Sequence, residues 1–108
     1  MKLVIAIIQD RDTDVALDQL SKNKIGVTRI ATSGGFIREG NTTLLMGVED
    51  ERVKLVTDVL AKACHRRKMF IPMAVGVSDA AYGMASQIEV EVGGATLFVF
   101  DVDHFEQV

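Results

Sequence analysis

Few side chains in this sequence combine the residue types and the spacing that catalysis requires. Cys64 and His65 are adjacent in sequence and are the residue types of a nucleophile and a base. However, neighbouring residues of a helix point about 100° apart, so these two side chains do not form a catalytic pair. His104 has no metal-ligand spacing to His65. We therefore interpret Cys64 as a buried thiol and both histidines as surface residues.

Three aspartates near the N-terminus, Asp10, Asp12 and Asp14, alternate as they do at the start of a calcium-binding loop. Val15 and Ser21 stand where such a loop needs its glycine and its distal glutamate. Capping of a following helix is the simpler interpretation. The sequence thus predicts no catalytic residues, no metal site and no cofactor, so we expect a protein that is not an enzyme.

A glycine-rich segment has better features for binding a ligand. It reads Thr32-Ser33-Gly34-Gly35-Phe36 and continues with Gly40-Asn41-Thr42-Thr43. Glycines let the main chain approach an anion closely, and clustered amides can bind phosphate. Phe36 offers a stacking surface for a base, and the Asn41 amide both donates and accepts. A hairpin with Phe36 in the core is the competing interpretation, and the composition of the segment leaves both open.

Regular patterns predict the elements that position this segment. Residues 3–8 are apolar at both odd and even positions, so both faces of the strand are apolar, which is typical of a central strand. Spacings of three and four predict a helix that starts near Thr13 and a second one from Val53 to Ala63, with Asp50 as its N-cap. β-branched and alternating residues predict further strands at 27–32 and 42–48.

The C-terminal half is less regular. Residues 66–87 have no clean period and contain the one proline, so we expect a long variable loop there. Residues 88–92 alternate strictly, and Gly93-Gly94 follows them. The pattern predicts a β-hairpin in which 95–102 pairs back onto 88–92.

The predicted order of elements is β-α-β-β-α-β with a C-terminal hairpin. This is the α+β ferredoxin-like arrangement, in which two helices cover one face of an antiparallel sheet. The other face is apolar as well, because residues 3–8 and 44–46 are apolar on both alternations. Self-association would cover it. We expect residues 1–108 to form a single domain.

Composition restricts the classes of function. The chain has 108 residues, 48% hydrophobic and 25% charged, which is typical of a soluble globular protein. A net charge of −3 argues against binding DNA or RNA. No apolar run has the roughly 18 residues of a membrane span, and the single cysteine excludes an internal disulfide. We expect a cytoplasmic protein without membrane insertion.

Several motifs resemble those of the PII-like cyclic di-AMP receptors (the DarA or PstA type). They are Gln9-Asp10, the stretch Ile30 to Phe36, Gly40-Asn41-Thr42-Thr43, the stretch Ile88 to Thr96, and the ending Val102 to Gln107. The likeness covers about residues 1–60 and 88–108. It implies a non-enzymatic homotrimer that binds cyclic di-AMP in the clefts between subunits and relays the signal through a flexible loop to a downstream protein.

The resemblance also implies a set of ligand contacts. Val27 and Thr28 would supply backbone groups and a hydroxyl, Asn41 would face an adenine, and Gly47 would leave room for the ligand. The full set is Val27, Thr28, Gly35, Phe36, Ile37, Asn41, Gly47 and Gln107.

The sequence departs from these receptors in three places. Gly26 replaces a common arginine, Lys24 replaces an asparagine, and residues 66–87 keep only a faint trace of the family segment, in Ser78 to Tyr82. Losing an arginine removes a charge-assisted contact to phosphate. Two alternatives therefore stay open: a sensor of another adenine nucleotide such as ATP or AMP, and a structural interaction module with a degenerate site.

Overall fold

The computed structural model describes residues 1–32, 40–72 and 87–108. The elements follow the order β1 (Lys2–Gln9), η1 (Asp10–Asp12), α1 (Thr13–Lys22), β2 (Thr28–Thr32), β3 (Asn41–Val48), η2 (Asp50–Arg52), α2 (Val53–Ala63), β4 (Arg67–Pro72), β5 (Gln87–Val92) and β6 (Ala95–Asp101). Both η elements are single turns of 3₁₀-helix. No helix within the described ranges is long and apolar enough to cross a membrane.

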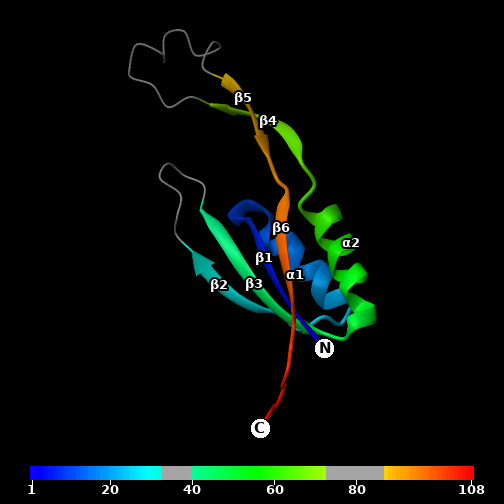
Figure 1. Ribbon diagram of the computed structural model, residues 1–108. Helices are drawn as coiled ribbons and strands as arrows, with labels where there is room; N and C mark the ends of the chain where they lie inside the picture. The colour runs from blue at the N-terminus through cyan, green and yellow to red at the C-terminus, as the bar shows by residue number, and fades with distance from the viewer. Residues whose placement is uncertain (33–39, 73–86) are drawn as a thin grey trace.

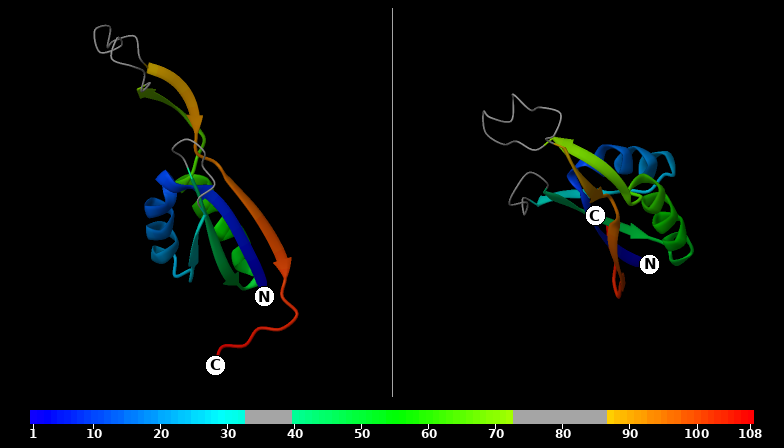
Figure 2. Two further views of the ribbon diagram at one scale, coloured as in Figure 1. Left: turned by 90° about the vertical axis from the view of Figure 1, so that its left-hand side faces the viewer. Right: turned by 90° about the horizontal axis from the view of Figure 1, so that it is seen from above.

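Four strands form one sheet in the order β2-β3-β1-β6, and each neighbouring pair is antiparallel. Both α-helices lie on the same side of this sheet (Figures 1 and 2). The two helices and the antiparallel sheet agree with the predicted α+β, ferredoxin-like arrangement. Every strand and helix predicted before residue 66 is present, with ends that differ by one or two residues.

The core lies between the sheet and the helices. Every second residue of β1, namely Val4, Ala6 and Ile8, is buried against it, as the pleat of a strand requires. Leu20 from α1 and Leu60 from α2 are fully buried on the other side of this layer. Burying each such side chain contributes roughly 1.5–3 kcal/mol, which fixes the helices on the sheet.

The opposite face of the sheet is also apolar, and we call it the open face. The register aligns Leu3 with Phe100 and Ile5 with Phe98, while Leu45 lies beside Ile5 on β3. Phe98 and Phe100 remain 48% and 50% exposed. None of the described elements covers this face (Figure 2, left). The prediction of a second apolar face is therefore confirmed.

The predicted C-terminal hairpin is wrong. β6 pairs with β1, whereas β5 pairs with β4 in a separate two-stranded sheet that we call the β4–β5 ribbon. Gly93 and Gly94 have φ of 93° and 89°, yet they do not reverse the chain. They join β5 to β6 where the chain passes from the ribbon to the main sheet (Figure 1). The free edge of β1 provides a longer and more apolar partner than the glutamate-rich β5.

The predicted loop over residues 66–87 is also corrected in part. Residues 67–72 form β4 and residue 87 begins β5, while residues 73–86 lie outside the described residues. The ribbon extends beyond the end of the main sheet (Figure 1). An ion pair from Lys68 to Glu89 at 3.3 Å joins its two strands, and Arg66, the residue just before β4, pairs with Glu91 of β5 at 3.6 Å.

The predicted helix caps are not formed. A 3₁₀ turn precedes each α-helix. Asp12 precedes α1 but makes no side-chain capping hydrogen bond, and the residue that precedes α2 is Arg52, not Asp50. Asp12 is instead buried against Arg67, and Asp50 accepts a hydrogen bond from the amino group of Met1 at 2.7 Å. That contact raises the pKa of the amino group and lowers the pKa of Asp50.

Candidate ligand-binding site

Two of the predicted contacts, Asn41 and Gly47, lie at opposite ends of β3. Asn41 is its first residue, beside Gln9, whereas Gly47 lies near its last, beside Leu3. Six residues of strand span about 20 Å. Thr28 aligns with Leu45 and so belongs to the Gly47 end. One chain therefore separates these residues into two groups.

The Asn41 end contains a small polar cavity of about 230 Å³, which we call the Asn41 pocket. Asn41 itself is exposed. The Gln9 side-chain carbonyl accepts a hydrogen bond from the Gly93 N–H at 2.9 Å, which closes one wall. The lining residues are Ile7, Ile8, Gln9, Asn41, Arg66, Gly93, Gly94, Ala95 and Thr96.

A buried hydroxyl network holds the chain beside Asn41. Thr42 donates to the Asp10 carboxylate at 2.5 Å, and Thr13 donates to the Thr42 hydroxyl at 3.1 Å. The Asp10 N–H donates to the Gly40 carbonyl at 3.1 Å. Thr13 and Thr42 are both almost fully buried. The entry to β3 is thus tied to the start of η1 and α1.

The base of the β4–β5 ribbon is fixed to the same region. Arg67 donates to Asp12 at 2.8 Å and to the His65 carbonyl at 3.0 Å. The Asp12 side chain is 5% exposed, and its second oxygen, Oδ2, has no hydrogen-bond partner among the described residues. Gly94 N–H donates to the Cys64 carbonyl. Arg66, Gly93 and Gly94, which flank the ribbon, also line the Asn41 pocket.

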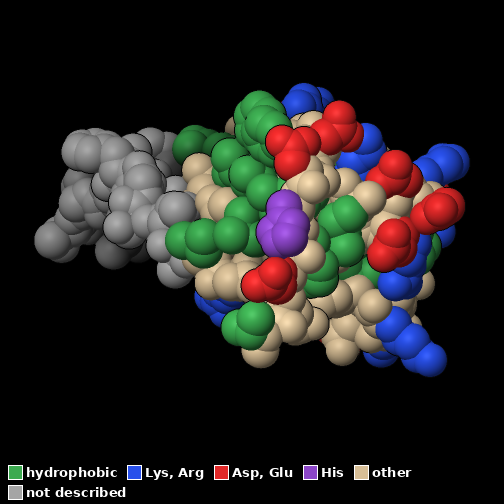
Figure 3. All heavy atoms as spheres, turned by 60° about the horizontal axis from the view of Figure 1, so that its bottom comes forward, with side chains coloured by type: hydrophobic (Ala, Val, Ile, Leu, Met, Phe, Trp, Pro, Cys, Tyr) green, Lys and Arg blue, Asp and Glu red, His purple; other side chains and the backbone are tan. Residues whose placement is uncertain are grey.

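The other end of β3 contains a mainly apolar cavity of about 300 Å³, which we call the Gly47 pocket. Its lining residues are Met1, Leu3, Thr28, Leu45, Met46, Gly47, Val102 and Phe105. A Cβ at Gly47 would be in ordinary contact with the Met1 sulfur, 3.9 Å away, so the wall is close to Met1 at this point. Figure 3 shows hydrophobic side chains gathered at the end of the molecule that carries both termini.

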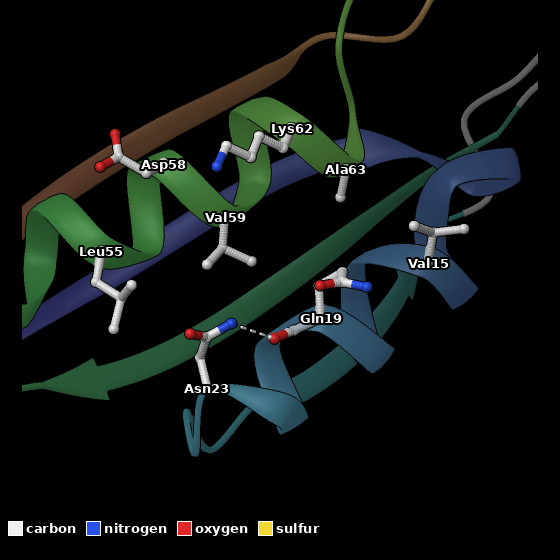
Figure 4. A pocket seen from close by; sticks show the side chains of 8 residues that line it. All are labelled: Val15, Gln19, Asn23, Leu55, Asp58, Val59, Lys62 and Ala63. Atoms are coloured by element: carbon white, nitrogen blue, oxygen red, sulfur yellow. Dashed lines mark hydrogen bonds between the residues drawn. The ribbon is translucent and has the colours of Figure 1, made fainter.

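A third cavity, of about 490 Å³, lies between the two helices on the outer side of the molecule. Val15 and Gln19 of α1 face Leu55, Val59 and Lys62 of α2 across it (Figure 4). It contains none of the residues predicted to contact a ligand.

In the described part of the chain, no three histidine, cysteine, aspartate or glutamate side chains form a metal-binding cluster. Cys64 is buried, as predicted, and burial raises the pKa of its thiol to about 11. At neutral pH this thiol is protonated, so it is a poor nucleophile.

Comparison with known proteins identifies the family. A family model described as cyclic-di-AMP receptor matches residues 1–108, the whole chain. The chain belongs to the cyclic-di-AMP receptor family. It is also similar to a solved structure described as a functionally unknown protein from Pediococcus pentosaceus. The two are 41% identical with a TM-score of 0.77, over 99% of this chain and 96% of the other.

The predicted contact residues can now be placed relative to the two pockets at the ends of β3. Thr28 and Gly47 lie together in the Gly47 pocket. Gln107 is exposed and follows the pocket-lining Phe105 by two residues, whereas Val27 is half-buried against the core. Gly35, Phe36 and Ile37 lie outside the described residues.

Sequence reasoning missed several residues that line the two pockets. Arg66 was in no predicted motif, and Thr96 and Phe105 belonged to motifs of the family resemblance but were not predicted as contacts. Gln9 also belonged to the motif that carried the family resemblance, which was the available signal for it. Arg66 begins a segment without periodicity, so no local pattern indicated where its side chain lies.

Proposed function

We propose that this protein is a cytoplasmic, PII-like signal-transduction receptor that binds cyclic di-AMP between the subunits of a homotrimer and catalyses no reaction. The observation that carries the proposal is the match of the whole chain to the cyclic-di-AMP receptor family. The proposed contacts are those predicted from the sequence, with Val27, Thr28, Asn41, Gly47 and Gln107 within the described residues.

The separation of Asn41 from Gly47 supports a site shared between chains. The Asn41 pocket and the Gly47 pocket lie at opposite ends of β3, about 20 Å apart along the strand. In a ring of identical subunits, one end of each subunit meets a different end of the next. The Asn41 pocket of one chain then faces the Gly47 pocket of its neighbour, and the ligand bridges them.

The chemistry of the two pockets is complementary to a cyclic dinucleotide. The Asn41 pocket is polar, with amide, hydroxyl and guanidinium groups, whereas the Gly47 pocket combines the Thr28 hydroxyl with apolar walls. An amide side chain can both donate to and accept from an adenine edge. Apolar walls suit the face of the base.

The ribbon is the proposed relay to an unidentified downstream protein. Its strands meet the main sheet at Gly93, whose N–H binds Gln9 in the wall of the Asn41 pocket. A ligand that contacts this wall shifts the ribbon only if it binds one ribbon position better than another. Phe70 and Ile88 on the ribbon are 65% and 42% exposed and are available to a partner.

Isothermal titration calorimetry of the purified protein tests the proposal. The panel is cyclic di-AMP, cyclic di-GMP, ATP, ADP and AMP. We expect saturable heat with cyclic di-AMP at one ligand per subunit and no comparable heat with the others. Binding of ATP or AMP in place of cyclic di-AMP would change the assigned ligand, and silence across the panel would refute a nucleotide receptor.

A further inference from the structure

Arg66 is the one charged side chain among the described residues that line the Asn41 pocket. The other described lining groups are neutral: the amides of Gln9 and Asn41, the Thr96 hydroxyl, glycine backbone and apolar side chains. A cation beside neutral hydrogen-bonding groups suits a ligand that combines an anionic group with polar groups. The cation binds the anionic group, and the neutral side chains exchange hydrogen bonds with the rest of the ligand. A nucleotide is such a ligand.

Two adjacent arginines at this point have different surroundings. The Arg67 side chain is 28% exposed, and its guanidinium binds Asp12 at 2.8 Å and the His65 carbonyl at 3.0 Å. The Arg66 side chain is 78% exposed, and its ion pair with Glu91 is longer, at 3.6 Å. Arg67 therefore anchors the ribbon, whereas Arg66 retains most of its donors for a ligand.

Gly94 positions the Arg66 side chain against the pocket wall. A Cβ built on Gly94 would lie 3.2 Å from Arg66 Nε and 3.4 Å from its Cγ. The arginine stem therefore lies directly over the glycine Cα. Because Gly94 also lines the Asn41 pocket, this contact keeps the guanidinium next to the cavity although the side chain is exposed.

We infer that Arg66 is a phosphate-binding residue of the receptor: its guanidinium exchanges Glu91 for a phosphate group of the ligand held in the Asn41 pocket. This rests on the proposed function, because it deepens the description of the same site. The planar guanidinium binds two phosphate oxygens at once, which an ammonium group cannot match. Because the proposed site joins the Asn41 end of one chain to the Gly47 end of its neighbour, Arg66 brings a positive charge to a site whose other half has Gly26 in place of the common arginine.

Calorimetric titration of cyclic di-AMP into Arg66→Gln, Arg66→Lys and the unaltered protein tests this inference. We expect Arg66→Gln to bind about tenfold more weakly, the lower end for a lost charge-assisted hydrogen bond, since the arginine is exposed. Arg66→Lys should fall between the two, because it keeps the charge and loses the planar fork. Added salt should weaken binding less in Arg66→Gln than in the unaltered protein.

Lys68→Gln is the matched control. Lys68 lies on the same ribbon and pairs with Glu89 at 3.3 Å, but it does not line the Asn41 pocket. It should bind cyclic di-AMP as the unaltered protein does. Equal losses of affinity in Arg66→Gln and Lys68→Gln, or no loss of affinity in Arg66→Gln, would overturn the inference about Arg66 and leave the proposed function intact. Absence of binding to the unaltered protein would instead refute the proposed function and remove the basis of the inference.

Discussion

Asn41 occupies an exposed position at the start of β3 and lines the Asn41 pocket. Substitution of exposed residues usually changes the free energy of unfolding by less than about 0.5 kcal/mol. A ligand edge left without its partner costs about 1–3 kcal/mol, which corresponds to at least about a fivefold loss. Asn41→Ala should therefore bind cyclic di-AMP at least fivefold more weakly and melt, without ligand, at the same temperature. A fall in melting temperature with unchanged affinity would assign Asn41 to folding.

Cys64 allows a prediction about pH, because burial raises the pKa of its thiol from 9.0 to about 11. A group whose pKa is higher in the folded than in the unfolded state stabilises the folded state fully when the pH lies below the pKa of the unfolded state. This contribution is present below about pH 9 and is lost as the pH rises toward 11. The stability of the unaltered protein should therefore fall more steeply over this interval than that of Cys64→Ala.

Urea unfolding of both proteins at several pH values between 8 and about 11 measures this difference. The thiol is 1% exposed, so an alkylating reagent at pH 8 should label it only after unfolding. Labelling of the native protein at the rate of the unfolded chain, or identical pH dependence in the two proteins, would contradict the buried, protonated thiol.

At the scale of elements, the junction between β5 and β6 depends on Gly93. Its φ of 93° is unfavourable for residues with a side chain, and a Cβ there would lie 2.2 Å from the His65 carbonyl oxygen. We expect Gly93→Ala to destabilise the protein by at least about 1–3 kcal/mol, the cost of such a backbone conformation alone. Gly26→Ala is the control, because a Cβ there meets nothing within 4 Å. Equal thermal stability of the two variants would contradict this role of Gly93.

The same junction shows where sequence reasoning reached its limit. Strands and helices before residue 66 follow from periodic burial, which is a local property. The Gly93-Gly94 pair has the local signature of a hairpin turn, but the pairing of β6 is decided by the free edge of β1, more than ninety residues away in sequence for Lys2 and Asp101. A local signal cannot report such a competition.

The ligand contacts remain predictions, and most of them came from the family resemblance. That resemblance gave Thr28 and Gly47, whereas Asn41 also belonged to a glycine-rich motif; the structure places these three residues in two cavities. Arg66 could not be predicted, because its position depends on the fold of the β4–β5 ribbon. That ribbon shows no clean alternation along β4, and Pro72 argued against a strand.

At the scale of the whole molecule, the open face is an apolar surface that no described element of the same chain covers. Leu3, Ile5 and Phe98 lie on it, and contiguous exposed apolar surface of this kind marks interaction sites. A trimer that covers this face would also bring the two pockets of neighbouring chains together. We expect light scattering of the unaltered protein to give about three times the chain mass of 11.8 kDa.

Phe98→Asp tests whether this face holds the assembly together. Phe98 is 48% exposed in one chain, so the subunit can fold with a charge there, but a carboxylate buried between subunits without a partner is strongly unfavourable. The variant should sediment as a monomer and lose cyclic di-AMP binding, because the proposed site needs two chains. Phe70→Asp makes the same change on the β4–β5 ribbon, at a side chain that is 65% exposed, and should remain a trimer. A monomeric Phe98→Asp that still binds cyclic di-AMP with full affinity would refute the shared site, and a trimeric one would move the interface to another face.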